Sequence, residues 1–302
     1  MSLKIISAEY GVGSQVIDVT SIVASRVEGD KLLTPVTNES FSNDPAPNKT
    51  KRLKLKYELD GKVIDKTYSE GVVVEIPESK NKIKGSRFSL NLPEVTLSTA
   101  CWGNESFLTS AIWAYKEFKD KANFGEKVFF ISENINYSEY KEFFEEESIR
   151  VEELSAKYNL ARYSHFVIKD IYKYVNKDFL MLFQNDGFID NISSWDDRYL
   201  ECDYIGAPWW YKDENNVGNG GFSIRSKKLL NILAEDDHIK EVVPEDHHIC
   251  RTYGEYLRET HGIKFASEDL ASKFSVEHGS YFSQFGFHGT WQLEAYIRRS
   301  TS

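Results

Sequence analysis

Cysteine is scarce in this chain of 302 residues: there are three, Cys101, Cys202 and Cys250, far apart in the sequence. A scattered, odd-numbered set forms neither a disulfide framework nor a zinc-ligand pattern, so we expect a reducing compartment. The chain also lacks any apolar run near the roughly 18 residues that a membrane-spanning helix requires. Its N-terminus has no signal-peptide pattern. Together these absences predict a soluble, cytoplasmic protein.

Positive charge is also in deficit, because 37 Lys and Arg residues face 47 Asp and Glu residues, for a formal net charge of -10. Non-specific nucleic-acid binding needs a cationic surface, so that class is excluded. An acidic protein can still recruit a cation at one site. A hydrophobic fraction of 41% is ample for packed cores, and the length predicts two domains.

Residues 1–93 have the pattern of strands. Lys4–Tyr10 and Gln15–Val23 are rich in β-branched residues and are separated by a glycine-containing turn. Asp60-Gly61 lies between two alternating segments and predicts a hairpin, because both turn positions require positive φ. No titratable cluster suited to catalysis occurs here. We therefore expect a small β-rich, sandwich-like accessory or interaction domain.

Residues 94–302 change to an alternation of strands and helices. Such alternation with apolar strands predicts an α/β domain with a mostly parallel sheet flanked by helices. In open sheets of this kind, ligands bind beyond the carboxyl ends of the strands. The clearest expected elements are strands at Val95–Cys101, Val128–Ile131 and Phe179–Phe183 and helices at Phe107–Phe118 and Leu160–Val175.

The buried-type strand Phe179–Phe183 runs directly into Gln184, Asn185, Asp186 and a glycine. A carboxylate at that edge of the sheet suits a divalent cation, which stabilises the charge that develops on a departing diphosphate. The other interpretation is that Asp186 caps a turn, because Asn-Asp-Gly is also ordinary turn chemistry.

Two segments between residues 203 and 225 suit the binding of a sugar. Trp209, with aromatic neighbours at 210 and 211, could form a platform on which a sugar ring stacks, or it could belong to a core loop. Gly220 and Gly221 allow a backbone to approach a ligand closely, or simply form a tight loop before a strand. Their spacing matches neither a phosphate-binding loop nor a dinucleotide fingerprint.

Two further segments carry titratable groups. Glu245 and Asp246, beside two histidines, suit a general base that deprotonates a sugar hydroxyl. Proline followed by acidic residues is equally the opening composition of a helix, and the two interpretations are compatible. His288 lies among glycines and aromatics near the end of the chain, as a hydrogen-bonded structural histidine or as one that closes over a cation.

These segments form an ordered set that resembles a known family. The motifs are Phe183-Gln-Asn-Asp186, Asp203-Tyr-Ile-Gly-Ala-Pro-Trp209, Gly218-Asn-Gly-Gly-Phe-Ser-Ile-Arg225, Pro244-Glu-Asp246, Phe274-Ser-Val-Glu277 and Phe287-His288-Gly289. They resemble bacterial and fungal proteins long catalogued as a domain of unknown function and now regarded as glycosyltransferases. The layout is also similar to metal-dependent, inverting β-galactosyltransferases of the GT-A fold. The resemblance covers roughly residues 95–292, and the ordered combination is more specific than any one motif.

The resemblance implies a GT-A-like domain at residues 94–302 and a role for each matching residue. Asp186 and His288 would bind Mn²⁺ or Mg²⁺, and Asp246 would be the catalytic base. The remaining implied contacts are Thr99, Trp102, Gln184, Asn185 and Asp186 to the donor nucleotide and Trp209, Gly220, Gly221 and Glu245 to the acceptor. One departure is that Gln184-Asn185-Asp186 stands in place of Asp-x-Asp, so one carboxylate is missing and cation affinity would be weaker.

The N-terminal module resembles the β-rich C-terminal domain of mitochondrial DnaJ-like proteins, through short matches within residues 5–70. The matches are Ala8-Glu-Tyr-Gly11, Asp18-Val-Thr20, Asn43-Asp-Pro-Ala-Pro47 and Leu53-Lys-Leu-Lys-Tyr57. That resemblance implies a protein partner or a peripheral membrane partner for the N-terminal domain, not an activity.

The predicted function is transfer of a hexose, of galactose or glucose type, from a UDP-sugar to a saccharide or lipid-linked glycan acceptor. The resemblance implies inversion at the sugar, a role in surface polysaccharide or lipopolysaccharide synthesis, and a location in the cytoplasm at the inner face of the membrane. One alternative is a non-catalytic glycan- or protein-binding module on a transferase scaffold. Another is a nucleotidyltransferase that forms a nucleotide sugar, although the chain lacks a Gly- and Lys-rich triphosphate loop.

Overall fold

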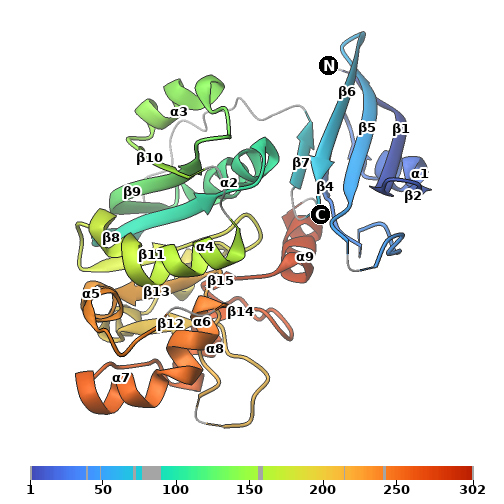
Figure 1. Cartoon of the computed structure of the whole chain (residues 1–302). Helices are drawn as coiled ribbons and strands as arrows, with labels where there is room; N and C mark the ends of the chain where they lie inside the picture. Colours follow the sequence, from blue (N-terminus) through green and yellow to red (C-terminus); the bar gives the residue numbers. More distant parts are fainter. Residues whose placement is uncertain are drawn as a thin grey trace. The chain divides into compact units, whose positions relative to one another are not determined.

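The computed structural model describes residues 2–38, 40–47, 49–70, 73–76, 90–155, 159–213, 215–240 and 243–300. The chain forms two compact units: Met1–Lys84 with Leu293–Ser302, and Gly85–Gln292. The division expected after residue 93 stays a prediction, because residues 77–89 lie outside the described part. The fold class is confirmed: an antiparallel β region precedes an α/β unit with a mostly parallel sheet flanked by helices (Figure 1).

The first unit contains two antiparallel sheets with the strand orders β2-β1-β5-β6 and β3-β4-β7. In β5 every second residue from Leu53 to Tyr57 is buried, as expected for a sheet with one face on a core. The hairpin at Asp60-Gly61 is confirmed, with φ of 50° and 80° at the two turn residues. The strands are β1 (Leu3–Val12), β2 (Gln15–Asp18), β3 (Val27–Glu28), β4 (Lys31–Pro35), β5 (Arg52–Leu59), β6 (Lys62–Ser69) and β7 (Val73–Ile76).

The expected strand Gln15–Val23 is wrong in its second half, where the chain forms helix α1 (Thr20–Ser25). The carboxylate of Asp18 accepts a hydrogen bond from the backbone N–H of Thr20 at 2.8 Å. This local bond from an aspartate to the residue two positions on turns the chain and starts a helix despite the β-branched composition.

The C-terminal helix α9 (Thr290–Ser300) runs from the second unit into the first. Its Glu294 is 5% exposed and accepts hydrogen bonds from the hydroxyls of Thr37 at 2.9 Å and Ser40 at 2.6 Å. A carboxylate buried this far needs such donors. The packing of Glu294 therefore explains why the last residues belong to the N-terminal unit.

The second unit contains a six-stranded sheet with the order β10-β9-β8-β11-β13-β12. All neighbours from β10 to β11 are parallel, and β13 is antiparallel to both of its neighbours. The chain passes outward from β8 to β10 and then returns to β11 on the other side of β8. The switch point lies between β8 and β11, where open α/β sheets bind ligands. The strands are β8 (Leu90–Cys101), β9 (Ala122–Ser132), β10 (Arg150–Leu154), β11 (Phe179–Leu182), β12 (Tyr204–Gly206) and β13 (Ser223–Ser226).

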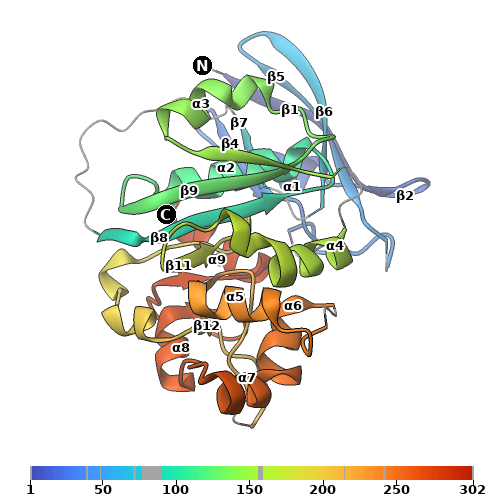
Figure 2. The same ribbon diagram turned by 60° about the vertical axis from the view of Figure 1, so that its left-hand side comes forward.

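Helices cover both faces of this sheet, which is why its strands are apolar on both sides (Figures 1 and 2). In β9, Phe130 packs on Phe166 on one face, while Phe129 packs on Tyr115 on the other. These partners belong to the helical segment that begins with α4 (Leu160–His165) and to α2 (Glu105–Phe118). The expected helix Leu160–Val175 continues from α4 through a π turn (Phe166–Asp170) and a 3₁₀ turn (Ile171–Tyr174).

The remaining elements of the second unit are short and follow the chain order. They are α3 (Lys141–Glu146), α5 (Lys227–Glu235), α6 (Glu245–His247), α7 (Gly254–His261), α8 (Glu268–Phe274), β14 (Ser275–Val276) and β15 (Gly286–Phe287), with 3₁₀ turns at Ser138–Tyr140, Ile192–Ser194 and Asp197–Glu201 and a π turn at His248–Thr252. In the described residues no helix combines the length and the apolar character that crossing a bilayer requires.

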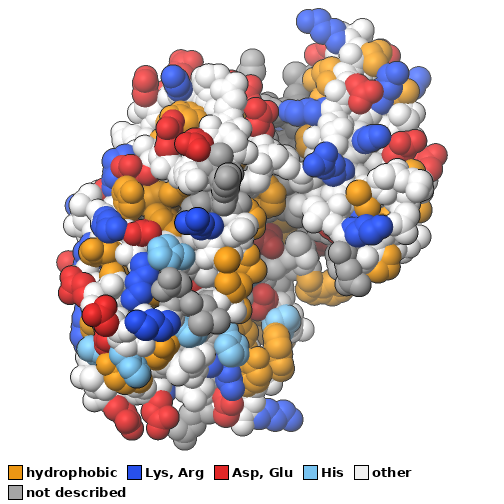
Figure 3. Space-filling view, viewed as in Figure 1, with side chains coloured by type: hydrophobic (Ala, Val, Ile, Leu, Met, Phe, Trp, Pro, Cys, Tyr) orange, Lys and Arg blue, Asp and Glu red, His pale blue; other side chains and the backbone are white. Residues whose placement is uncertain are grey.

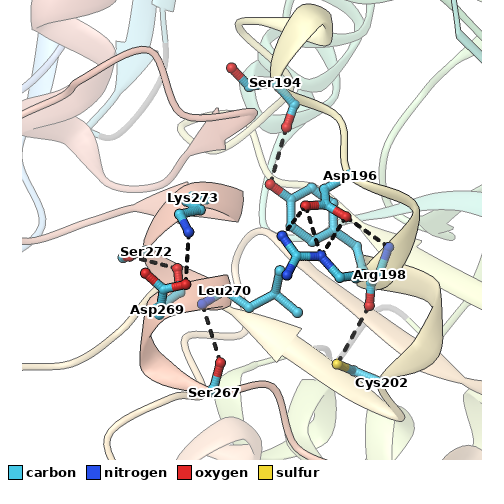
Figure 4. A network of polar contacts seen from close by, with 10 residues as sticks. Ser194, Asp196, Arg198, Cys202, Ser267, Asp269, Leu270, Ser272 and Lys273 are labelled. Carbon is cyan, nitrogen blue, oxygen red and sulfur yellow. Dashed lines mark hydrogen bonds and ion pairs between the residues drawn. The ribbon is translucent and has the colours of Figure 1, made fainter.

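The segment between β11 and β12 is held by local side-chain bonds (Figure 4). Asp196 accepts from the backbone N–H of Arg198 at 3.0 Å and also pairs with its guanidinium, which lowers the pKa of Asp196 to about 2. Nearby, Ser267 caps α8. On the face shown in Figure 3, acidic and basic side chains are interspersed, so the negative net charge is not gathered in one patch there.

Candidate functional site

A tight two-residue turn places Asp186 at the carboxyl end of β11. Gln184 and Gly187 exchange two backbone hydrogen bonds, with N···O distances of 3.0 and 3.2 Å, so that Asn185 and Asp186 form the tip. The neighbouring strand β8 ends beside it, since Leu182 pairs with Ser98. Asp186 therefore lies at the switch point of the sheet, with its side chain 19% exposed.

His288 lies at the centre of a polar cluster around this turn. Its Nδ1 is 3.1 Å from Oε1 of Glu277. On the other side of the ring, Nε2 is 3.2 Å from Oε1 of Gln184 and 3.6 Å from Oδ1 of Asp186. The ring therefore connects a carboxylate on one side with two oxygen-bearing side chains on the other.

The short parallel pair β14–β15 brings Glu277 and His288 together. Val276 pairs with Phe287, and the next residue of each strand projects beside the other. The backbone N–H of His288 donates to the carbonyl of Val276 at 2.9 Å, which fixes the register. The sequence gave no role to Glu277, because this pairing joins two short segments through tertiary structure.

The charges around His288 favour its protonated form. Burial alone lowers its pKa, but Asp186, Glu277 and Asp246 together raise it above the ordinary value. For Glu277, burial raises the pKa, and the bonds and charge of His288 more than offset this and lower it. The cluster is therefore an anionic site in which His288 supplies the nearest positive charge.

Two glycines press directly on the His288 ring. A Cβ atom at Gly221 would lie 2.0 Å from Nε2, and one at Gly187 would lie 2.7 Å from Cδ2. These distances are far below any van der Waals contact. The glycines are therefore required so that the backbone can approach the ring and hold it in place.

Gly221→Ala is expected to displace His288 and to lower the free energy of unfolding by about 1–3 kcal/mol, the usual cost of overpacking. Chemical unfolding measures the stability, and the imidazole NMR signals report the ring. Gly254→Ala is the matched control: it lies at the start of α7, and its added Cβ would meet nothing closer than 3.6 Å. Unchanged stability and unchanged imidazole signals in Gly221→Ala would contradict the packing.

Asp246 lies at the start of α6 and reaches the same glycine loop. Its Oδ2 accepts from the backbone N–H of Gly220 at 2.9 Å, and its Oδ1 accepts from the N–H of His247 at 2.7 Å. The side chain is half-buried, and its charge contributes to the raised pKa of His288. Both expected features are present here, a helix start and a positioned carboxylate.

Glu245 points the other way, into the protein, and pairs with Arg225. Its Oε1 is 3.0 Å from Nη2 of Arg225, and the two side chains are 5% and 0% exposed. Burial lowers the pKa of Arg225, but Tyr204 and Glu245 raise it overall, so the guanidinium stays charged. Its Nη1 has no hydrogen-bond partner. Direct contact of Glu245 with an acceptor stays a prediction, while the buried pair itself was not anticipated.

The aromatic and donor-side residues occupy different environments. Trp209 is half-buried, with its ring 6.0 Å from that of His247, while Trp210 is 63% exposed, 4.7 Å from His278. At the end of β8, Thr99 is only 2% exposed. Trp102 is half-buried and stacks on Phe107 at 6.0 Å. Trp102 is thus the more accessible of the two predicted donor contacts.

The donor set fits a cation that is completed by a ligand. Two ligands at right angles on a cation with bonds of about 2.1 Å lie about 3 Å apart, close to the spacings of Gln184 and Asp186 from Nε2 of His288. A carboxylate on the far nitrogen, as Glu277 provides, is the usual support of a metal-binding histidine. Within the described ranges, no three His, Cys, Asp or Glu side chains gather as a metal site. Such an incomplete set suits Mg²⁺, which usually takes one or two carboxylates plus substrate phosphates.

Comparison with known proteins gives one family match. The model of a family described as a protein of unknown function (DUF5672) matches residues 148–288, which include Asp186, Asp246 and His288. No curated protein matches. Among solved structures, a cytidylyltransferase from Leptospira borgpetersenii is similar at 17% identity and a TM-score of 0.30, over 57% of this chain and 73% of that chain. A similarity this weak carries no argument about the reaction.

Proposed function

We propose that the second unit transfers a hexose from a UDP-sugar to a saccharide acceptor, with inversion at the sugar and with a bound Mn²⁺ or Mg²⁺ ion. The observation that carries the proposal is the convergence of Asp186 and His288 with Asp246 at the switch point of an α/β sheet. Pockets at such switch points bind nucleotides and other phosphorylated ligands.

Asp186, His288 and the side-chain oxygen of Gln184 would hold the cation. When bound, the ion supplies positive charge to the departing diphosphate. Glu277 holds Nδ1 of His288, so that Nε2 stays directed toward Asp186. In this proposal Gln184 replaces a second carboxylate, which leaves the site less negative and predicts weaker cation binding than a two-acid site.

Asp246 acts as the general base. The acceptor hydroxyl attacks the anomeric carbon, the hydroxyl proton passes to a carboxylate oxygen of Asp246, and the bond from that carbon to the diphosphate oxygen breaks. The hydrogen bonds from Gly220 and His247 orient the carboxylate. Attack and departure on opposite faces give the inverted product.

The rest of the donor and acceptor is assigned by position. Trp102 at the end of β8 and Asn185 at the turn would contact the nucleotide, with Thr99 shaping the floor beneath them. Trp209, Gly220 and Gly221 would line the acceptor side. A saccharide of a surface polysaccharide, carried on a lipid at the inner face of the membrane, is the proposed acceptor, and the first unit would bind a protein or membrane partner.

Calorimetry with UDP, with and without Mn²⁺, tests the donor half of the proposal. Wild-type protein is expected to bind UDP only with the cation, and Asp186→Asn to lower that affinity at least about tenfold, because a cation ligand is lost. Asp237→Asn, an exposed aspartate after α5, is the matched control and should bind as wild type does. Cation-independent binding, or none, would remove the transferase proposal and favour the glycan- or protein-binding alternative.

A further inference from the structure

A second cavity in the same unit lies beside the loop that joins β12 to the glycine segment. Its volume is about 530 Å³, within the range of sites that hold small ligands. Its walls come from the loop at residues 211–217 and from the start of α8 at residues 266–268. The residues used below are Tyr211, Lys212, Asn216 and Glu268.

The loop that forms the wall is fixed by backbone and side-chain bonds. Its ends are joined by the bond from the N–H of Trp209 to the carbonyl of Asn216 at 2.6 Å. Arg251 donates to both carboxylate oxygens of Asp213 at 3.0 and 2.8 Å and also packs over the Tyr211 ring at 3.7 Å. The cavity is therefore preformed, which reduces the entropic cost of binding a ligand.

The side chain of Asn216 is the strongest sign that this cavity binds something. Asn216 is 5% exposed and lines the cavity, yet its carboxamide makes no hydrogen bond within the described residues. Buried carboxamides nearly always have partners. By contrast, the equally buried Asn219 accepts from the N–H of Gly221 and bonds to Glu277. Asn216 thus presents an unused donor and acceptor to the cavity.

Three other polar groups are directed to the same ligand space without a protein partner. In the described part of the chain, the hydroxyl of Tyr211, the ammonium of Lys212 and the carboxylate of Glu268 make no hydrogen bond or ion pair. One positive and one negative group cancel, so the lining is neutral overall and rich in both donors and acceptors. A sugar, with hydroxyls that both donate and accept and a C–H face that packs on an aromatic ring, matches this lining.

The cavity is close to the proposed site of transfer. Asn216 is four residues before Gly220, whose N–H contacts Asp246. Four residues of chain span at most about 14 Å, even when fully extended. We propose that this cavity is a subsite for a neutral sugar unit of the acceptor, beyond the unit whose hydroxyl reacts. The word acceptor rests on the proposed transferase function, while the saccharide site itself rests on the cavity.

Saturation-transfer NMR on the full chain tests the subsite without nucleotide or metal. The probes are the neutral sugars maltotriose, cellotriose and lactose, with sialyllactose as an anionic comparison. At least one neutral probe is expected to bind. Asn216→Ala should weaken its binding about tenfold, the effect of losing hydrogen bonds to the ligand, and Tyr211→Phe, which keeps the ring, should weaken it by a smaller factor.

The matched control is Tyr137→Phe. Tyr137 lines a smaller cavity of about 340 Å³ beside the start of β10, with a lysine and a glutamate near it, and should leave probe binding unchanged. Thermal unfolding of each variant excludes loss of the fold. Binding of sialyllactose alone, binding that Asn216→Ala leaves unchanged, or no binding of any neutral probe would each overturn the subsite.

The same samples separate this inference from the transferase proposal. Asp186→Asn should lose cation-dependent UDP binding and keep saccharide binding, because the cavity does not include Asp186. Saccharide binding in a protein that never binds UDP would keep the subsite and remove the transferase proposal. UDP binding without any saccharide signal would do the reverse.

Discussion

Asp246→Asn is expected to abolish sugar transfer while leaving the fold and UDP binding in place. Loss of a general base typically costs about 10²–10⁴-fold in rate. The stability cost is small, about 1–2 kcal/mol, because one carboxylate oxygen becomes an NH₂ group and faces a backbone N–H of Gly220 or His247. The variant therefore separates chemistry from folding.

The measurement is the rate of UDP release with a UDP-sugar and an acceptor, alongside calorimetry of UDP with Mn²⁺. Asp237→Asn again serves as the control, since it makes the same change at an exposed position. If Asp246→Asn keeps the full rate of transfer, Asp246 is not the base. If it loses UDP binding as well, the carboxylate belongs to the donor side instead.

Glu245→Ala is expected to lower the free energy of unfolding by about 3–5 kcal/mol, one of the largest effects available in this chain. The substitution leaves Arg225 fully buried with its countercharge removed, and Nη1 already has no hydrogen-bond partner. A buried guanidinium cannot escape this cost by losing its proton.

Denaturant unfolding of Glu245→Ala, Arg225→Met and the double variant Arg225→Met with Glu245→Leu measures the pair. The double variant should recover much of the loss, because replacing both charges with apolar groups removes the uncompensated charge. Asp269→Ala breaks the exposed pair with Lys273 (Figure 4) and should change stability by less than about 1 kcal/mol. A loss below that size in Glu245→Ala would contradict the buried ion pair.

The sequence predicted those parts of the fold that depend on local pattern. The apolar run at residues 128–131 is a central strand because its side chains are buried on both faces, and the Asp60-Gly61 turn closes a hairpin. The error at α1 arose because one local bond from Asp18 outweighed β-branched composition. Assignment of the last helix to the first unit depends on Glu294 and its distant partners Thr37 and Ser40, which no local pattern contains.

For the candidate site, the sequence selected Asp186, Asp246 and His288, and the structure brings all three into one neighbourhood. Motifs at strand ends can be recognised because the carboxyl edge of a parallel sheet gathers them. The supporting residues were missed. Arg225 reads as an ordinary strand residue, and Glu277 acquires its partner only through the pairing of β14 with β15.

A single peptide unit separates the contacts to the two acidic ends of the site. The amide of Gly220 binds Asp246, and the next α-carbon, that of Gly221, lies against the imidazole of His288. Consecutive α-carbons are held about 3.8 Å apart by covalent geometry. Shifting either contact therefore shifts the other, so an engineer who wants to accommodate a bulkier sugar would have to rebuild both ends at once.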